Sequence, residues 1–261
     1  MSGLEWTFDT VAPIYEKMRP GYPDELYRTL FEYAPINADS NVAEIGIGGG
    51  QATLPLLETG CRLTAIEYGE QFSRLVRDKF SSYVNFSVIT GRFEETELEE
   101  NSFDLVFSAS AFHWIPEKEG YERVYSMLKN GGVFARFANH PYRDKGNPEL
   151  SREIDKAYRD FYDRFYNKES KAPSEYTEAQ ARERAEIAEK YGFREVKYAL
   201  FYRKRTFSAT EYTALLGTYS DHIAIEEPIR AAFFARIEEA IDRHGGFITL
   251  YDTIDLELAR K

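Results

Sequence analysis

The sequence has little cysteine and histidine: a single cysteine, Cys61, and four histidines among 261 residues. One thiol cannot form an internal disulfide or a cysteine-built metal site, as expected in a reducing compartment. No cluster of His and Asp residues with metal-ligand spacing is evident either. The sequence therefore predicts neither a structural disulfide nor a metal.

Long apolar runs and an excess of basic residues are also missing. No stretch approaches the roughly 18 apolar residues of a membrane span, and the start, MSGLEWTFD, lacks the basic and apolar segments of a signal peptide. With 33 Lys and Arg against 44 Asp and Glu, the formal charge is −11, which does not favour binding to a phosphate backbone. We expect a cytoplasmic protein with no membrane partner and no nucleic-acid partner.

What is present is an alternation of two kinds of segment. Runs rich in β-branched and aromatic residues lie at 41–45, 62–67, 83–89, 103–108 and 133–138, separated by segments long enough for a helix. Parallel neighbouring strands require such crossover connections. The pattern predicts an α/β fold with a doubly wound, mostly parallel sheet, which later runs near 196–205 and 247–257 extend to seven strands.

Capping residues mark several of the expected helices. Thr177 and Ser208 each begin a capping box, whereas an Asn-Gly-Gly turn at 130–132 and a Gly-Gly pair at 245–246 are expected to end helices. No repeat or flexible linker divides the chain, so residues 1–261 are predicted to form a single domain. Its expected parts are a core at about 40–140 plus 193–206 and 247–261, an N-terminal helical lid at 1–39, and cap insertions at about 142–190 and 208–244.

The most informative stretch, EIGIGGG at 44–50, follows the first predicted strand. Glycines let the backbone turn sharply and approach a ligand closely. The dinucleotide fingerprint Gly-x-Gly-x-x-Gly fails here, because its third glycine would fall on Gln51. The spacing Glu44-x-Gly46-x-Gly48-x-Gly50 resembles instead the first motif of class I S-adenosylmethionine-dependent methyltransferases.

Further segments extend this resemblance. Glu67 ends the second strand about 20 residues after the glycine loop, where a carboxylate can bind ribose hydroxyls. NAD-binding folds share that spacing, so a nucleotide oxidoreductase is a distant alternative. GRFE at 91–94, SFDLVF at 102–107, AFHWI at 111–115 and LKNGGVF at 128–134 resemble, in order, later segments of the methyltransferase family. The resemblance implies a Rossmann-like methyltransferase fold with S-adenosyl-L-methionine as co-substrate and S-adenosyl-L-homocysteine as product.

The N-terminal pattern Tyr15, Arg19-Pro20, Tyr22-Pro23 is similar to the preface of small-molecule methyltransferases, including relatives of trans-aconitate methyltransferases. It implies that Tyr15 and Arg19 close over the cofactor, with the Arg19 guanidinium available to the methionine carboxylate. The cofactor-binding residues implied by the whole resemblance are Tyr15, Arg19, Glu44, Gly46, Gly48, Gly50, Glu67, Tyr68, Arg92, Phe93 and Trp114. In the same family Asp104 serves the fold by hydrogen bonding around the glycine loop.

Two histidines are candidates for catalysis. His113 and His140 follow the fourth and fifth strands, at the edge where open α/β sheets bind ligands. A hydroxyl or carbon acid as methyl acceptor would need one of them as a general base, whereas a carboxylate acceptor needs none. A helix or loop role for His113 and a turn role for His140 explain these residues nearly as well.

These features favour one function and leave a second open. The leading hypothesis is an enzyme that transfers a methyl group to a small-molecule acceptor by direct in-line displacement, with the cap helices shaping the acceptor pocket. The alternative is a non-catalytic module that binds or senses S-adenosylmethionine. A content of 19 Tyr, 19 Phe and 2 Trp fits a pocket lined with rings, although most of these residues must lie elsewhere.

Overall fold

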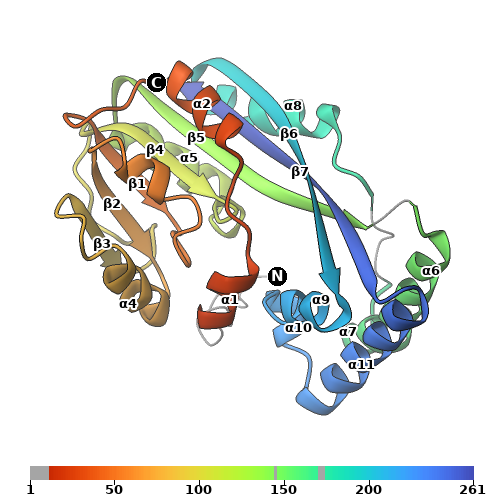
Figure 1. Cartoon of the computed structure of the whole chain (residues 1–261). Coiled ribbons are helices and arrows are strands. Elements are labelled where there is room, and N and C mark those ends of the chain that lie inside the picture. The colour runs from red at the N-terminus through yellow and green to blue at the C-terminus, as the bar shows by residue number, and fades with distance from the viewer. Residues whose placement is uncertain (1–11, 144–145, 170–173) are drawn as a thin grey trace. The chain divides into compact units, whose positions relative to one another are not determined.

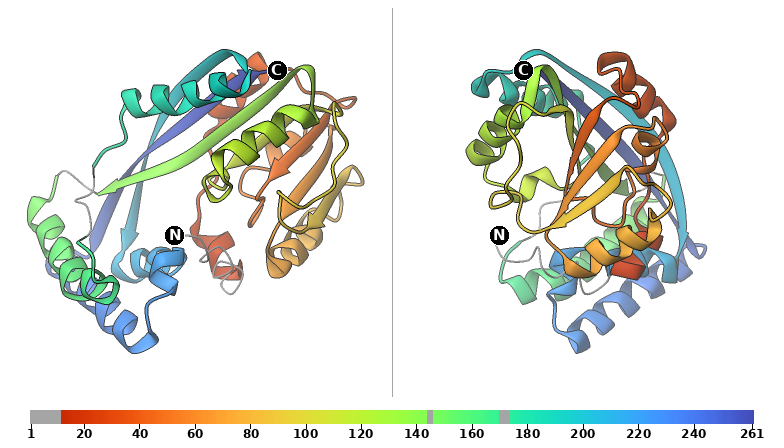
Figure 2. Two further views of the ribbon diagram at one scale, coloured as in Figure 1. Left: turned by 180° about the vertical axis from the view of Figure 1, so that it is seen from behind. Right: turned by 90° about the vertical axis from the view of Figure 1, so that its left-hand side faces the viewer.

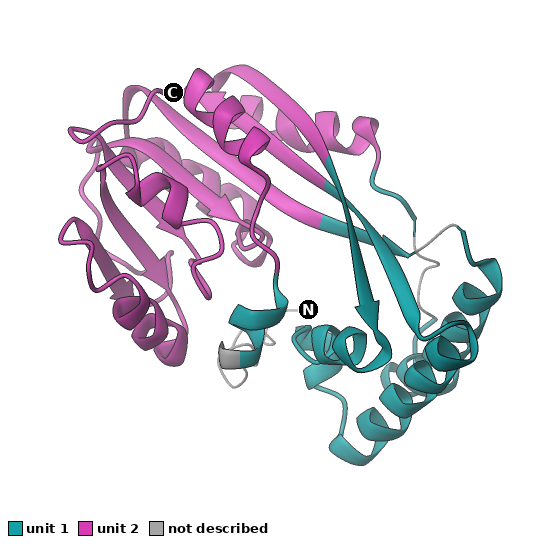
Figure 3. Cartoon of the chain, viewed as in Figure 1, with its two compact units in different colours: residues 1–19, 140–176, 202–253 teal, residues 20–139, 177–201, 254–261 magenta. Residues whose placement is uncertain are grey.

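The computed structural model describes residues 12–143, 146–169 and 174–261. The chain divides into two compact units, coloured separately in Figure 3. We call residues 1–19, 140–176 and 202–253, where described, the helical unit. Residues 20–139, 177–201 and 254–261 form the sheet unit.

The strands form a seven-stranded sheet in the order β3-β2-β1-β4-β5-β7-β6 (Figure 1). Strand β1 pairs in parallel with β2 and β4, β2 pairs in parallel with β3, and β4 pairs in parallel with β5. The predicted doubly wound, mostly parallel sheet is therefore confirmed. The strands are β1 Asn41–Ile45, β2 Arg62–Glu67, β3 Phe86–Thr90, β4 Phe103–Ala109, β5 Leu128–Arg143, β6 Arg194–Ser208 and β7 Phe247–Arg260.

Helices of the sheet unit pack on both faces of the strands (Figure 2). Successive strand residues point to opposite faces: Val42 packs with α2, α3 and α4, whereas Ala43 packs with α5 and η4. Both side chains are fully buried. The helices of this unit are α2 Asp24–Tyr33, α3 Leu54–Leu57, α4 Glu70–Lys79, η2 Phe112–Trp114, α5 Glu117–Met127, α8 Glu178–Glu186 and η4 Ile187–Tyr191.

One predicted helix end is wrong. Helix α5 ends at Met127, and the Asn-Gly-Gly at 130–132 lies inside β5. Leu128 already pairs with Phe103 of β4, and the register shifts before the next pair. Gly131 adopts φ 81° and its amide donates to the Lys261 carbonyl. The glycines therefore accommodate an irregular strand and do not terminate the helix.

The helical unit has its own apolar core. Ile154 of α6, Leu215 of α9 and Phe233 of α11 are at most 1% exposed and pack together. The predicted capping box is present, because Ser208 Oγ accepts from the Glu211 amide and the Glu211 carboxylate accepts from the Ser208 amide. The helices are α1 Ala12–Met18, α6 Pro148–Ala157, the π-helical η3 Tyr158–Asp163, α7 Arg164–Tyr166, α9 Ala209–Leu216, α10 Ser220–Ile223 and α11 Glu227–Arg243. Across the described ranges, no helix is long and apolar enough to cross a membrane.

Candidate active site

The loop after β1 depends on glycine. Gly46, Gly48 and Gly50 adopt φ values of 71°, 53° and 72°, a region that side chains with a Cβ rarely occupy. A Cβ at Gly46 would lie 2.4 Å from the Cβ of Ala111, and one at Gly50 would lie 2.6 Å from the ring of Phe80. The loop therefore packs closely enough that only glycine fits at these two positions.

Glu67 joins this loop to the end of β2. Its carboxylate accepts a hydrogen bond from the Gly48 amide at 2.9 Å and another from the Gly69 amide at 2.8 Å. Each carboxylate oxygen has two lone pairs, so one amide on each is compatible with additional ribose hydroxyls. The sequence predicted the ribose role, but it did not predict that Glu67 also holds the glycine loop.

Glu44 is buried at the end of β1. Thr53 Oγ1 donates to its Oε2 at 2.8 Å, and its Oε1 has no hydrogen-bond partner among the described residues. Burial raises the pKa of Glu44 to about 8, with a smaller rise from nearby Glu67 and an opposing effect of the Thr53 hydrogen bond. A neutral carboxyl at pH 7 fits an oxygen that lacks a donor.

The segment after β3 lies beside the end of β2. Glu67 is in register with Thr90, and the Gly91 amide donates to the Glu67 carbonyl. The Arg92 guanidinium lies 4.8 Å from the centre of the Tyr68 ring, which is exposed. Phe93 is instead buried in the core of the sheet unit. Tyr68 and Arg92 therefore lie near the surface beside Glu67, at the carboxyl ends of β2 and β3. The buried Phe93 ring holds the segment against the core.

The loop after β4 contacts the glycine loop through Ala111. Ser110 adopts φ 56° and its hydroxyl lies 2.9 Å from the Tyr22 hydroxyl. His113 and Trp114 follow in η2, with ring centres 5.0 Å apart. The structure therefore brings the 110–114 segment next to the loop that the sequence singled out.

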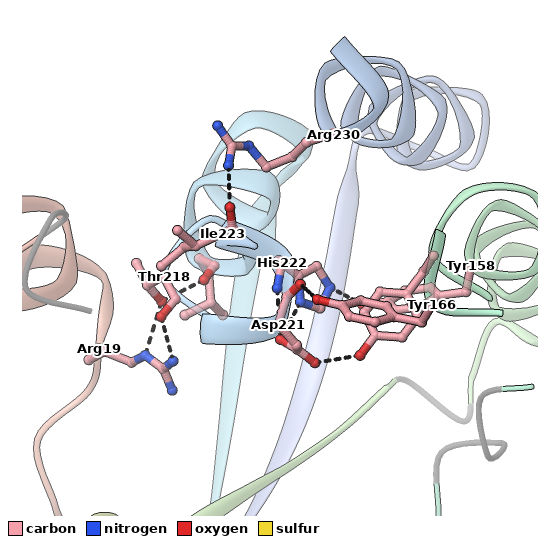
Figure 4. Close-up of polar contacts among 10 residues, drawn as sticks. Arg19, Tyr158, Tyr166, Thr218, Asp221, His222, Ile223 and Arg230 are labelled. Atoms are coloured by element: carbon pink, nitrogen blue, oxygen red, sulfur yellow. Dashed lines mark hydrogen bonds and ion pairs between the residues drawn. The ribbon is translucent and has the colours of Figure 1, made fainter. Parts of the chain in front are cut away.

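Three of the predicted site residues belong to the helical unit. Arg19 donates to Thr218 Oγ1 at 3.0 Å and to the Thr218 carbonyl at 2.9 Å (Figure 4), and its guanidinium lies over the Tyr15 ring. His140 stacks on Tyr176 with ring centres 3.7 Å apart. The other predicted residues, His113 included, lie in the sheet unit.

The prediction that Asp104 bonds around the glycine loop is wrong. Asp104 accepts from the Asn41 amide at 2.8 Å and from Lys129 Nζ at 2.7 Å. Asn41 begins β1 and Asp104 lies near the start of β4, so this contact is at the amino ends of parallel strands. The glycine loop follows the opposite ends. Asp104 thus serves the fold, but at the other edge of the sheet.

The helical unit contains a cavity of about 480 Å³, and most of its lining residues lie in the segments 142–190 and 208–244, which the sequence predicted as cap insertions. Rings and charged groups line it, among them Arg143, Tyr158, Tyr212, Tyr219, Asp221 and His222. None of these lining residues was among the site residues predicted from the sequence. The described residues hold no group of three or more His, Cys, Asp or Glu side chains placed to bind a metal ion.

Comparisons with known proteins match the part of the chain that contains this site. A family model described as a methyltransferase domain matches residues 43–135, which include the glycine loop, Glu67 and the 110–114 segment. A Geobacillus methyltransferase is 33% identical over 147 residues, which are 53% of this chain and 68% of that protein. A Schizosaccharomyces pombe methyltransferase is 26% identical over 238 residues, covering 90% of this chain and 87% of the relative.

A solved structure shares the fold. A candidate type II methyltransferase from Anaeromyxobacter dehalogenans superposes with a TM-score of 0.63 at 23% identity, covering 93% of this chain and 97% of that one. The chain has the glycine loop and the acid at the end of β2 on which the resemblance to the family was based. The chain belongs to the class I S-adenosylmethionine-dependent methyltransferase family.

Proposed function

We propose that the protein transfers a methyl group from S-adenosylmethionine to a small-molecule acceptor by direct in-line displacement. The observation that carries the proposal is the cavity of the helical unit, whose volume of about 480 Å³ is that of a small-ligand pocket. Its lining combines aromatic faces with a few charged groups, which is typical of such pockets. We therefore assign the acceptor to this cavity.

The sheet unit carries most of the residues proposed to hold the cofactor. Glu67 is proposed to bind the ribose, and the Gly46, Gly48 and Gly50 backbone permits close approach. Tyr68 and Arg92 are proposed to flank the adenine, since they stand exposed or half-exposed beside Glu67. Glu44 is proposed to stabilise the glycine loop, because its carboxyl accepts a hydrogen bond from Thr53, which follows the loop.

The remaining proposed contacts concern the charged parts of the cofactor. Arg19 is proposed to bind the methionine carboxylate, for which its guanidinium would exchange the Thr218 oxygens that it holds in the structure. The rings of Tyr15 and Trp114 are proposed to attract the positive sulfonium. Phe93 acts indirectly, because its buried ring fixes the segment that presents Arg92.

The reaction needs positioning more than covalent catalysis. When bound, S-adenosylmethionine supplies a methyl group already activated on a sulfonium, which the acceptor takes in one displacement. The protein's own contribution is to align the two reactants and exclude water, which accounts for a large share of the rate. His113 and His140 are the bases proposed from the sequence, and their glutamine variants test each of them separately.

A radiolabelled methyl-transfer assay on a metabolite extract tests the proposal. We expect label to appear in a low-molecular-weight product and to fall sharply with Glu67→Ala when the labelled cofactor is limiting. Label in the protein or nucleic-acid fractions would contradict a small acceptor. Binding of S-adenosylhomocysteine with no labelled product in any extract would support a non-catalytic sensing module instead.

A further inference from the structure

Three side chains form a hydrogen-bonded chain at the cavity of the helical unit. His222 Nδ1 lies 2.7 Å from Asp221 Oδ1, and His222 Nε2 lies 3.0 Å from the Tyr158 hydroxyl (Figure 4). His222 is 3% exposed, so its ring is reached through Tyr158 and not directly from solvent. Asp221, His222 and Tyr158 all line the cavity.

Asp221 is held in place by hydrogen bonds from several residues. Asp221 Oδ2 accepts from the Tyr162 hydroxyl at 2.8 Å, and the Asp221 carbonyl accepts from the Tyr166 hydroxyl at 2.5 Å. Burial acts to raise the pKa of Asp221, but the hydrogen bonds from His222 and Tyr162 lower it below its usual value. An ionised Asp221 makes Nδ1 the protonated nitrogen of a neutral His222. Nε2 is then left to accept the Tyr158 proton.

The rings of Phe233 and Phe234 pack beside the His222 imidazole. Phe233, which is fully buried, stacks on the His222 ring with centres 5.9 Å apart. Hydrogen bonds between buried polar groups add little net stability, because removing these groups from water offsets most of the gain. Stability alone therefore gives no reason for an acid, an imidazole and a phenol in series at the wall of a cavity.

We infer that Asp221, His222 and Tyr158 relay a proton away from the acceptor, and that the acceptor nucleophile is a hydroxyl or an amine N–H and not a carboxylate. This inference rests on the proposed function, which places the acceptor in the cavity. Tyr158 touches the acceptor, and His222 and Asp221 act through Tyr158. The relay takes the place of His113 and His140 as the base.

The transfer balances in one concerted step. The acceptor proton passes to the Tyr158 oxygen while the Tyr158 proton passes to His222 Nε2. The electron pair freed on the acceptor forms the bond to the methyl carbon, and the pair of the breaking carbon–sulfur bond stays on sulfur. The ionised Asp221 stabilises the resulting imidazolium, which returns its proton to the Tyr158 oxygen, and the Tyr158 proton passes to solvent in the cavity once the product has left.

Other charged groups lie near the relay. Arg143 lies over the Tyr158 ring at 5.4 Å and pairs with Asp155 at 2.6 Å. Arg230 of α11 donates to the carbonyl of Ile223, the last residue of α10. The remaining charged residues that line the cavity are Arg159, Asp163 and Glu169. Assignment of a pH effect to the relay therefore requires comparison of variants.

Nitrogen-15 NMR of the histidines in the full chain tests the relay without any acceptor. We expect the His222 signal, identified by its loss in His222→Gln, to show a protonated Nδ1 and an unprotonated, hydrogen-bonded Nε2 at neutral pH. A neutral ring protonated on Nε2 would overturn the inference, because Tyr158 would then accept from His222 and not donate to it.

The chemistry of the product tests the acceptor class. Label transferred to the metabolite extract is treated with mild alkali, which releases volatile methanol from a methyl ester but not from an ether or an amine. We expect the label to stay non-volatile. Volatile label would show carboxylate methylation and overturn the inference while leaving methyl transfer intact. If the wild type labels nothing, the proposed function fails, and the NMR result still decides the direction of the relay.

Variants then separate catalysis from structure. Tyr158→Phe and His222→Gln are expected to lower the single-turnover rate about 100-fold or more at pH 7, with a smaller loss at alkaline pH. Binding of S-adenosylhomocysteine should not change. Asp221→Asn is the further variant if either of these fails to fold, and His244→Gln, which alters a histidine paired with Glu153 in the same unit, is the matched control. An unchanged rate, or an equal loss at every pH, would contradict the relay.

Discussion

At the scale of single residues, Glu67 combines a structural role with a proposed ligand contact. Glu67→Ala removes the acceptor for the Gly48 and Gly69 amides as well as the proposed ribose partner. Hydrogen bonds to a charged group contribute about 1.5–3 kcal/mol, so we expect S-adenosylhomocysteine to bind roughly 10- to 100-fold more weakly in calorimetric titration. Glu70→Ala, which removes an exposed pair with Arg74, should bind as the wild type does. Equal affinity in both variants would refute the ribose assignment.

Glu44 gives the protein a pH-dependent stability. Its carboxyl titrates near 4.5 in an unfolded chain and near 8 in the folded one, so the folded state holds more protons between these values. The stabilisation is complete below about pH 4.5 and is lost as the pH rises towards 8, by an amount on the order of a few kcal/mol. Glu44→Gln cannot ionise and should flatten this decline in urea unfolding at pH 5, 6.5 and 8. Parallel curves for the two proteins would show that Glu44 is not the cause.

At the scale of elements, the loop between β1 and α3 depends on the absence of side chains. Gly46→Ala places a side chain on a residue with a left-handed backbone conformation. It also brings the new Cβ to 2.4 Å from the Cβ of Ala111. Gly131→Ala is a matched control, because Gly131 has a similar φ and no atom within 4 Å of an added Cβ. We expect about 1–2 kcal/mol of destabilisation in the control and about 1–3 kcal/mol more in Gly46→Ala, which should also lose S-adenosylhomocysteine binding. Equal unfolding midpoints would contradict the close packing.

The two capping boxes allow a comparison between the units. Thr177→Ala removes the side-chain cap of α8 in the sheet unit, and Ser208→Ala removes that of α9 in the helical unit. Each should cost about 1 kcal/mol and speed amide exchange mainly in its own helix. Hydrogen bonds from the Ser208 amide and, second, from its hydroxyl lower the pKa of Glu211; Ser208→Ala removes only the hydroxyl, so this pKa should rise part of the way to its usual value. Unchanged exchange in α9 would show that the cap does not stabilise this helix.

Elements were predicted where local patterns are strong. Helix α9 was expected from Ser208 and Glu211, since a capping box involves residues only three apart. The end of α5 was missed because Leu128 joins β5 through its pairing with Phe103, a contact that no local pattern announces. The role of Asp104 was expected at the wrong edge for the same reason: its partner, Lys129, is 25 residues away.

At the scale of the whole molecule, the division into units predicts where ligands act. A ligand that binds only the folded state stabilises it, by about 2.7 kcal/mol at 100 times its dissociation constant. We expect S-adenosylhomocysteine to slow amide exchange most strongly in the sheet unit, at the 46–50 loop and around Gly69. Hydrogen exchange with mass spectrometry measures this. Protection confined to the helical unit would refute the cofactor assignment.

The sequence by itself determined the features that depend on near neighbours along the chain: the alternation of strands and helices, the glycine loop, the capping boxes and the acid at the end of β2. Glycine conformations and helix caps are local, so their residues suffice to predict them. Only the tertiary structure decided that Glu67 binds the glycine loop and that Tyr158 meets His222 across 64 residues of chain. Such contacts depend on how helices pack around a shared core, and apolar spacing fixes which face a helix buries but not which polar side chains then meet.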